Sequence, residues 1–144
     1  MFVPEDFAVP AEHSNDRLRL RMLSVADAQK DYEAVVETRI RLRKSSHHGW
    51  PREGFTLDEN IADLEIHERE FNNREAFAYT VVSLDESRVL GCVYINPGDG
   101  EHDAVVRLWV RDSEQRILAF LMTTVQAWVA DVWPFTSVRF ENIG

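Results

Sequence analysis

The sequence predicts a single α+β domain with a mixed central sheet, and three observations support this fold class. The chain has 144 residues, the length of one domain with one hydrophobic core. Apolar and basic residues alternate over 17–23, a pattern typical of a half-buried strand. Apolar residues recur at helical spacing in three other segments, and runs rich in aromatic and β-branched residues predict strands between them.

The expected elements follow the order β-α-α-β-β-β-α-β. They are a strand over 17–23, helices over 28–44 and 57–71, strands over 76–83, 89–95 and 104–110, a helix over 117–133 and a strand over 136–140. Thr56 and Glu59 form a capping box at the start of the second helix, and Pro134 ends the third. An extended N-terminal arm is expected over 1–16, followed by a single domain over 17–144.

The charge balance argues against several classes of partner. Lys and Arg total 16 against 25 Asp and Glu, giving a net charge of -9. No basic stripe is therefore expected for nucleic acid or an anionic membrane surface. Cys92 is the only cysteine, so no intramolecular disulfide is expected. The acidic segment from Met1 to Asp6 lacks the features of a signal peptide, and we expect a cytoplasmic protein.

Three stretches of the sequence carry a family resemblance. Residues 17–28 join an alternating strand to a helix start, 77–95 contain a hairpin with Gly91, and Trp109–Arg111 end a strand. These stretches are similar to the opening strand and first helix, the central hairpin and the fourth strand of the GNAT superfamily of N-acetyltransferases. The resemblance covers roughly 17–140. It implies an acyl-CoA-dependent N-acetyltransferase, with acetyl-CoA as cofactor and a small amine or a peptide amine as acceptor.

The sequence departs from this family in two places. The family's motif, Gln/Arg-x-x-Gly-x-Gly/Ala, follows the fourth strand, and its backbone N–H groups hold the pyrophosphate of acetyl-CoA. The corresponding stretch, 110–120, contains no glycine. The family's fourth helix and last two strands, which often carry a tyrosine general acid, have no counterpart here. The resemblance therefore predicts a GNAT-like fold that is truncated at its C-terminal end.

The junction between the strand over 104–110 and the next helix is the expected cofactor site. A helix N-terminus offers unpaired N–H groups that can hold an anion. Asp112 and Glu114, however, add negative charge there. Two interpretations stay open, an ordinary capped helix and a modified acyl-CoA site. The residues that the resemblance brings to the cofactor are Val110, Arg111, Ser113, Gln115 and Arg116.

The turn before the strand over 104–110 contains the expected catalytic residues. Glu101 and His102 precede Asp103, and a histidine between carboxylates can act as a general base. In the resembled family such a group takes the proton of the acceptor amine, directly or through water. His102 or Glu101 is therefore the expected base. The alternative is a solvated hairpin tip without a catalytic role.

The loop over 44–55 provides the first expected substrate-binding side chains. It contains His47, His48 and Trp50, and in the resembled family this loop helps to shape the acceptor pocket. The alternative is a mobile polar loop with Trp50 anchored in the core. Adjacent histidines point in different directions, and the charged segment 67–70 lacks the second histidine of a zinc motif. We therefore expect no metal site, and a charged helix face over 67–70.

Two strand residues complete the expected substrate site. Tyr94 shares a strand face with Cys92, which places it at a central cleft or in the core. Arg107 faces the same side as its apolar neighbours Val105 and Trp109. A charge in that position predicts either a partner carboxylate or a ligand anion.

A second function class stays open beside catalysis. The absent phosphate motif favours a non-catalytic GNAT-fold protein that works in binding or dimerisation. Trp109, Trp128, Trp133 and Phe135 occur late in the chain, where they close the core or form an exposed apolar patch. Such a patch beside an unpaired sheet edge predicts a homodimer through the C-terminal region.

Overall fold

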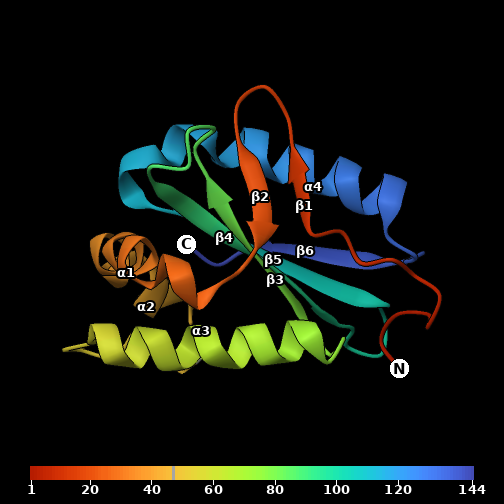
Figure 1. Ribbon diagram of the computed structural model, residues 1–144, viewed down its shortest axis with the longest axis horizontal. Helices are drawn as coiled ribbons and strands as arrows, with labels where there is room; N and C mark the ends of the chain where they lie inside the picture. The colour runs from red at the N-terminus through yellow and green to blue at the C-terminus, as the bar shows by residue number, and fades with distance from the viewer. Residues whose placement is uncertain (47) are drawn as a thin grey trace.

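The computed structural model describes residues 1–46 and 48–144, which form a six-stranded sheet with helices on both faces (Figure 1). The strands are β1 (Glu12–Ser14), β2 (Arg19–Met22), β3 (Phe77–Val82), β4 (Val89–Pro97), β5 (Ala104–Val110) and β6 (Val138–Asn142). The helices are η1 (Val25–Asp27), α1 (Ala28–Glu37), α2 (Arg39–Ser45), α3 (Leu57–Asn72), η2 (Asp112–Ile117) and α4 (Leu118–Val132), where η marks a 3₁₀ helix. The predicted α+β architecture with a mixed sheet is confirmed.

The strands lie in the sheet in chain order, from β1 to β6. Neighbouring strands from β1 to β5 are antiparallel. β6 runs parallel to β5, with Ala104 opposite Val138 and Leu108 opposite Asn142, so η2 and α4 form the crossover between them. Gly91 lets β4 and β5 approach closely, because a Cβ atom there would lie 2.0 Å from the Trp109 carbonyl oxygen.

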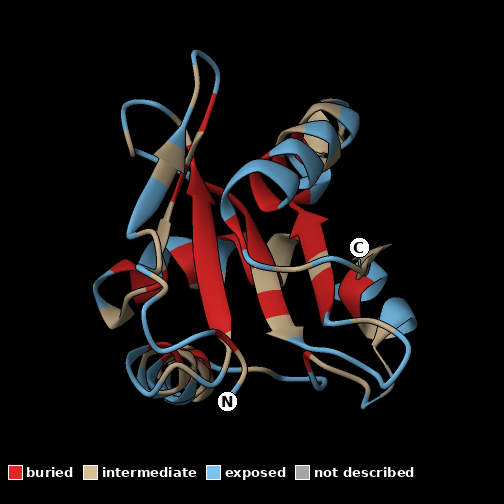
Figure 2. Ribbon diagram, turned by 90° about the vertical axis from the view of Figure 1, so that its right-hand side faces the viewer, coloured by how far each residue is buried: buried red, intermediate tan, exposed pale blue. Residues whose placement is uncertain are grey.

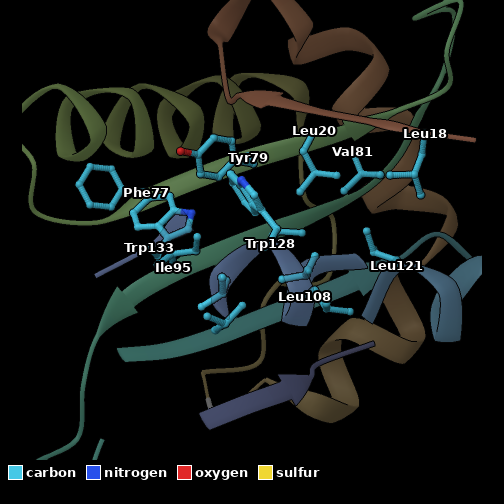
Figure 3. Close-up of a cluster of buried hydrophobic side chains, with 14 of the residues drawn as sticks. Leu18, Leu20, Phe77, Tyr79, Val81, Ile95, Leu108, Leu121, Trp128 and Trp133 are labelled. Atoms are coloured by element: carbon cyan, nitrogen blue, oxygen red, sulfur yellow. The ribbon is translucent and has the colours of Figure 1, made fainter. Parts of the chain in front are cut away.

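Two hydrophobic layers flank the sheet, because successive strand residues point to opposite faces. In β3, Phe77 and Tyr79 enter the layer that contains α4, whereas Ala78 and Val82 enter the layer that contains α1, α2 and α3. Figure 2 shows the central strands as the most buried part of the molecule. Figure 3 shows Tyr79 beside Trp128, whose ring meets it edge to face with the centroids 5.0 Å apart.

The aromatic residues late in the chain lie in two different layers. Trp128, Trp133 and Phe135 pack in the α4 layer, where the last two rings stack with their centroids 5.8 Å apart. Trp109 lies on the opposite face of the sheet. All three tryptophans are buried, so they close the core rather than form an exposed patch. Dimerisation through the C-terminal region stays a prediction.

Two elements differ from the sequence-based expectation. The helix expected over 28–44 is divided at Thr38, whose φ of -101° and ψ of 7° leave the helical region. Thr38 is fully buried and its hydroxyl accepts a hydrogen bond from the Asp112 N–H, so a tertiary contact accompanies this break. Within 1–16, β1 pairs with β2 and Val3 is buried in the core. β1 gives no strand signal in the sequence because its residues are polar.

Candidate functional site

The junction after β5 meets the C-terminal end of α1. β5 ends at Val110, η2 forms the turn, and α4 begins at Leu118. Glu37, the last residue of α1, and Thr38 contact this turn from a distant part of the sequence. The tertiary structure therefore gives the turn's N–H groups side-chain partners that lie far from it in the sequence.

The Glu37 carboxylate is the main partner of the turn. Its Oε2 accepts hydrogen bonds from the N–H and the hydroxyl of Ser113, each at 2.9 Å. Arg111 donates from Nε to Oε2 at 3.2 Å and from Nη2 to Oε1 at 2.9 Å. The Arg111 hydrogen bond, followed by those from Ser113, lowers the pKa of Glu37 to about 2. The carboxylate is therefore charged at neutral pH.

Two further polar groups of the junction are bonded within the chain. The Asp112 N–H donates to the Thr38 hydroxyl at 3.1 Å. The Gln115 side-chain amide donates to the Val110 carbonyl at 2.6 Å, so it binds the end of β5. The predicted cofactor residues thus gather at one turn, but several of their polar groups already bond to the protein itself.

Each carboxylate of the turn has an arginine partner. Glu114 is 7% exposed and pairs with Arg88 and Arg116, each at 2.8 Å. Asp112 pairs with Arg41 at 2.8 Å. The negative charges that the sequence places at the junction are therefore balanced by side chains from other elements.

A pocket of about 390 Å³ opens between α1, α3 and β4, on the face of the sheet that α1 to α3 cover. Apolar residues such as Leu23, Val35 and Leu64 form much of its wall. Its polar and aromatic side chains are Asp31, Trp50, Asn60, Asp63, His67, Tyr94 and Asn96. A small molecule fits a concave site of this size and mixed character.

Asp31 gives the pocket a buried carboxylate. It projects from α1, is 4% exposed, and accepts a hydrogen bond at Oδ2 from the Asn60 side-chain amide at 3.0 Å. Burial raises the pKa of Asp31 to about 6, because desolvation outweighs the opposing effect of Asn60. The group is still mostly charged at pH 7, and it forms no salt bridge with the described residues.

A second carboxylate and aromatic rings line the same pocket. Trp50 donates from Nε1 to Asp63 Oδ2 at 3.2 Å. The His67 ring lies 5.4 Å from the Tyr94 ring, measured between centroids. Burial lowers the pKa of His67, so this imidazole is neutral at pH 7. The lining residues therefore combine carboxylates with aromatic faces and include no Lys or Arg.

A second cavity, of about 320 Å³, adjoins the pocket and shares Trp50 and Ile143 with it. His48 and Arg107 line this cavity. Arg107 donates from Nε to Glu141 Oε2 at 3.1 Å. Of the two interpretations for Arg107, the structure thus shows the partner carboxylate, which β6 supplies.

The predicted substrate-binding residues come together around these two cavities. Trp50 and Tyr94 line the pocket, and His48, Trp50 and Arg107 line the adjoining cavity. The Tyr94 hydroxyl faces the core as well, since it accepts a hydrogen bond from Trp109 Nε1 at 3.0 Å. His47 lies outside the described residues. The binding role of these side chains stays a prediction.

The predicted catalytic residues lie in the turn between β4 and β5. The N–H groups of Glu101 and His102 donate to Asp99 Oδ1 at 3.1 and 3.0 Å, and His102 Nδ1 lies 3.1 Å from the same oxygen. Neither residue lines the pocket or the adjoining cavity. β5 has 7 residues, so this turn and the junction are roughly 20 Å apart at ~3.3 Å per residue. Their role as base stays a prediction.

Several polar pocket residues were not predicted from the sequence, although a signal exists for Asp31, Asn60 and His67. Asn60, His67 and Phe71 share one stripe of α3, and Asp31 lies on the stripe of α1 that holds Val35. A polar residue inside an apolar helix stripe marks a buried polar group. His67 lines the pocket, which corrects its expected place on a charged helix face.

Metal binding and membrane spanning find no support in the described chain. Within 1–46 and 48–144, no three residues among His, Cys, Asp and Glu gather closely enough to hold a metal ion. None of the helices in those ranges is both long and apolar enough to cross a membrane.

The chain is similar to known proteins in its fold. No protein-family model and no curated protein matches the chain. Among solved structures, the microcin C7 self-immunity acetyltransferase MccE, in complex with acetyl-CoA and AMP, matches with a TM-score of 0.65. The identity is 18%, over 82% of this chain and 66% of that one. The fold is that of the GNAT acetyltransferases.

Two further structures support the GNAT fold. RimL, a ribosomal L7/L12 α-N-protein acetyltransferase in complex with coenzyme A, matches with a TM-score of 0.65 and 15% identity over 84% of this chain and 67% of that one. The ribosomal-protein-S5-alanine acetyltransferase from Vibrio fischeri matches with a TM-score of 0.64 and 17% identity, over 83% and 67%. The chain spans about two thirds of the length of these structures.

Two N–H groups at the start of the junction already have side-chain partners within the chain. The family resemblance places the pyrophosphate on the N–H groups of the turn, where Glu37 now binds Ser113 and Arg111. The Asp112 N–H is likewise engaged by Thr38. A pyrophosphate on the same donors would meet the Glu37 carboxylate, and the two anions would repel each other.

Proposed function

We propose that this protein binds a small amine or a peptide amine in the pocket and acts as an N-acetyltransferase toward that amine. The GNAT fold supports the reaction class, because the solved structures that share it are acetyltransferases. The amine is supported by one observation, the Asp31 carboxylate. This group is 4% exposed and has no salt-bridge partner among the described residues.

A protonated amine matches the chemistry of the pocket. A buried carboxylate without a counter-charge is costly, and an ammonium group would neutralise it. The rings of Trp50 and Tyr94 offer faces that attract a cation. Because its pKa is about 6, Asp31 can also accept a proton from the bound amine near neutral pH. Asp31 is therefore a second candidate for the general base, beside His102.

A second function is favoured by the junction. Glu37 binds Arg111 and Ser113, two of the predicted cofactor residues, and this supports an amine-binding protein that transfers no acetyl group. The two proposals agree on the pocket and differ on the cofactor. Binding and transfer therefore have to be measured separately.

Amine binding is tested first, by calorimetry with aliphatic and aromatic primary amines and a short peptide with a free N-terminus. We expect Asp31→Asn to weaken binding at least tenfold. Glu33→Gln, at an exposed position of the same helix, serves as the control and should leave the affinity unchanged. If the wild-type protein binds none of these amines, both proposals fail.

Acetyl transfer is then followed as release of the free CoA thiol from acetyl-CoA in the presence of the amine that binds most tightly. Transfer supports the first proposal, and tight amine binding without transfer supports the second. His102→Ala adds a test of the base. Loss of transfer with amine affinity retained would assign the base to His102 rather than to Asp31.

A further inference from the structure

We propose that the cavity beside the pocket binds a carboxylate, so that the two cavities together take an amine that also carries an acid group, such as a short peptide. This inference deepens the proposed function and rests on it for the amine end of the ligand. Its basis is a separation of charge between the two cavities. The described lining of the pocket contains Asp31 and Asp63 but no Lys or Arg, whereas Arg107 lines the adjoining cavity.

Arg107 retains hydrogen-bond donors for a ligand. Its Nε donates to Glu141 Oε2 at 3.1 Å. In the described part of the chain, its two Nη groups have no hydrogen-bond partner. Glu141 is shared, because its Oε1 also pairs with Arg139. A guanidinium that is held at Nε alone can still donate from its Nη groups, and a carboxylate is the acceptor that matches their geometry and charge.

Two more donors line the same cavity, those of Ser46 and His48. The Ser46 hydroxyl oxygen accepts from the N–H groups of His48 and Trp50, at 3.2 and 3.1 Å. Its own proton finds no acceptor among the residues that the structure describes, and the His48 imidazole can donate as well. Glu141 is the one carboxylate in the described lining of this cavity. The cavity therefore offers donors, whereas the pocket offers carboxylate acceptors.

The register of the sheet places the two cavities side by side. Tyr94, in the wall of the pocket, lies directly opposite Arg107 in the pairing of β4 with β5. Residues paired in this way have Cβ atoms about 5 Å apart on one face of the sheet. Trp50 and Ile143 belong to the walls of both cavities. A short peptide can therefore place its amine at Asp31 and its acid group at Arg107 by crossing one shared wall.

Four peptides separate the two ends of such a ligand in a calorimetric test. Triglycine carries both charges, triglycine amide only the amine, N-acetyltriglycine only the acid, and N-acetyltriglycine amide neither. A peptide of this length reaches up to about 10 Å. We expect the wild type to bind triglycine about tenfold more tightly than triglycine amide, because the acid adds charge-assisted hydrogen bonds. This comparison of ligands needs no variant, so it does not depend on how a variant folds.

A substitution assigns the preference to one side chain. Arg107→Gln should abolish the preference for triglycine over its amide and leave the affinity for the amide unchanged. Arg69→Gln is the matched control and should keep the full preference, because Arg69 is exposed on α3 and lines neither cavity. Circular dichroism checks the fold of both variants, since Arg107→Gln also loses the contact with Glu141.

The carboxylate can come from the end of a peptide or from an acidic side chain. The amide of the peptide Gly-Asp-Gly carries only the side-chain carboxylate, whereas triglycine carries only the terminal one. Tighter binding of the first peptide than of triglycine amide, lost in Arg107→Gln, assigns the cavity to an acidic side chain. A gain confined to triglycine assigns it to the terminal carboxylate.

The outcomes separate this inference from the proposed function. The inference is overturned if the wild type binds neither acid more tightly than triglycine amide, or if Arg107→Gln keeps the preference. In both cases the proposed function survives when triglycine amide binds more tightly than N-acetyltriglycine amide. If N-acetyltriglycine binds through Arg107 and no amine binds, the carboxylate site stands and the proposed function fails. If none of the peptides binds, both fail.

Discussion

The pocket and the junction each receive a carboxylate from α1, and the two carboxylates have opposite surroundings. In the pocket, Asp31 is 4% exposed and its side-chain partner is the neutral amide of Asn60. At the junction, Glu37 is 29% exposed and accepts from Arg111 and Ser113. Burial raises the pKa of Asp31 to about 6, whereas the donors lower the pKa of Glu37 to about 2.

This difference shows in which of the two places a bound ligand could stabilise the protein. Glu37 has its counter-charge inside the chain, so an additional anion at the junction must replace it. Asp31 has no counter-charge among the described residues, so an added cation in the pocket would relieve an existing cost. Both carboxylates belong to one helix, α1 (Figure 1). The same helix thus supplies one carboxylate that is paired within the chain, Glu37, and one that has no charged partner among the described residues, Asp31.

The largest effect on stability is expected when the junction loses the Glu37 carboxylate. Glu37→Ala should lower the free energy of unfolding by about 2 kcal/mol, because the buried Arg111 guanidinium loses its charged partner. Urea titration measures this change. Glu33→Ala, the exposed control, should stay within about 0.5 kcal/mol of the wild type. Equal stabilities of the two variants would show that the Glu37 contacts contribute nothing.

Removal of the Asp31 carboxylate from the pocket should change the stability in the opposite direction. Asp31→Asn should raise the free energy of unfolding at pH 7 by roughly 1 kcal/mol, because a buried charge is removed. The raised pKa means that the folded state binds a proton more tightly than the unfolded state. The gain should therefore be full above pH 6 and shrink as the pH falls toward 3.8. A loss of stability at pH 7 would point to a cationic partner of Asp31.

Acid should remove the stability that the Glu37 contacts contribute at the junction, the reverse of its effect on Asp31. The lowered pKa of Glu37 means that the unfolded state binds its proton more tightly. The stability difference between wild type and Glu37→Gln should be present above about pH 4.5 and disappear as the pH falls toward 2. After allowance for solvent screening of this partly exposed pair, we expect about 1 kcal/mol. A difference that does not change with pH would contradict this assignment.

The smallest effect is expected for a substitution in the wall of the pocket, at Trp50. Trp50→Phe keeps an aromatic face but removes the hydrogen bond from Nε1 to Asp63. Amine affinity should fall about threefold, roughly 0.6 kcal/mol, with a larger loss for Trp50→Ala. Calorimetry with the same amines compares the two variants. An unchanged affinity in both would place the amine away from Trp50.

The fold was largely predictable because its signals are local. Alternation in β2 and the Thr56 cap of α3 were both readable, and Thr56 accepts from the Glu59 N–H at 3.2 Å. The break at Thr38 was not readable, because it accompanies a contact with a residue far along the chain. Long-range contacts of this kind leave no periodic trace in the sequence.

The candidate site was predictable only in part. The acceptor loop and the strand faces led to Trp50 and Tyr94, which do line the pocket. Asp31, Asn60 and His67 stayed hidden within helix stripes, where a lone polar residue resembles an ordinary amphipathic variation. Whether these side chains line a pocket depends on which helices pack against each other, and the sequence alone does not reveal this packing.

By itself, the sequence determined the order of strands and helices, the absence of glycine from the junction and the excess of negative charge. These features follow from residue type and spacing, which act locally. Only the tertiary structure decided that Glu37 enters the junction and that Asp31 faces a pocket in which the described residues supply no counter-charge. The two residues are chemically similar acids on one helix. Their different roles come from the side chains that other elements bring to each of them.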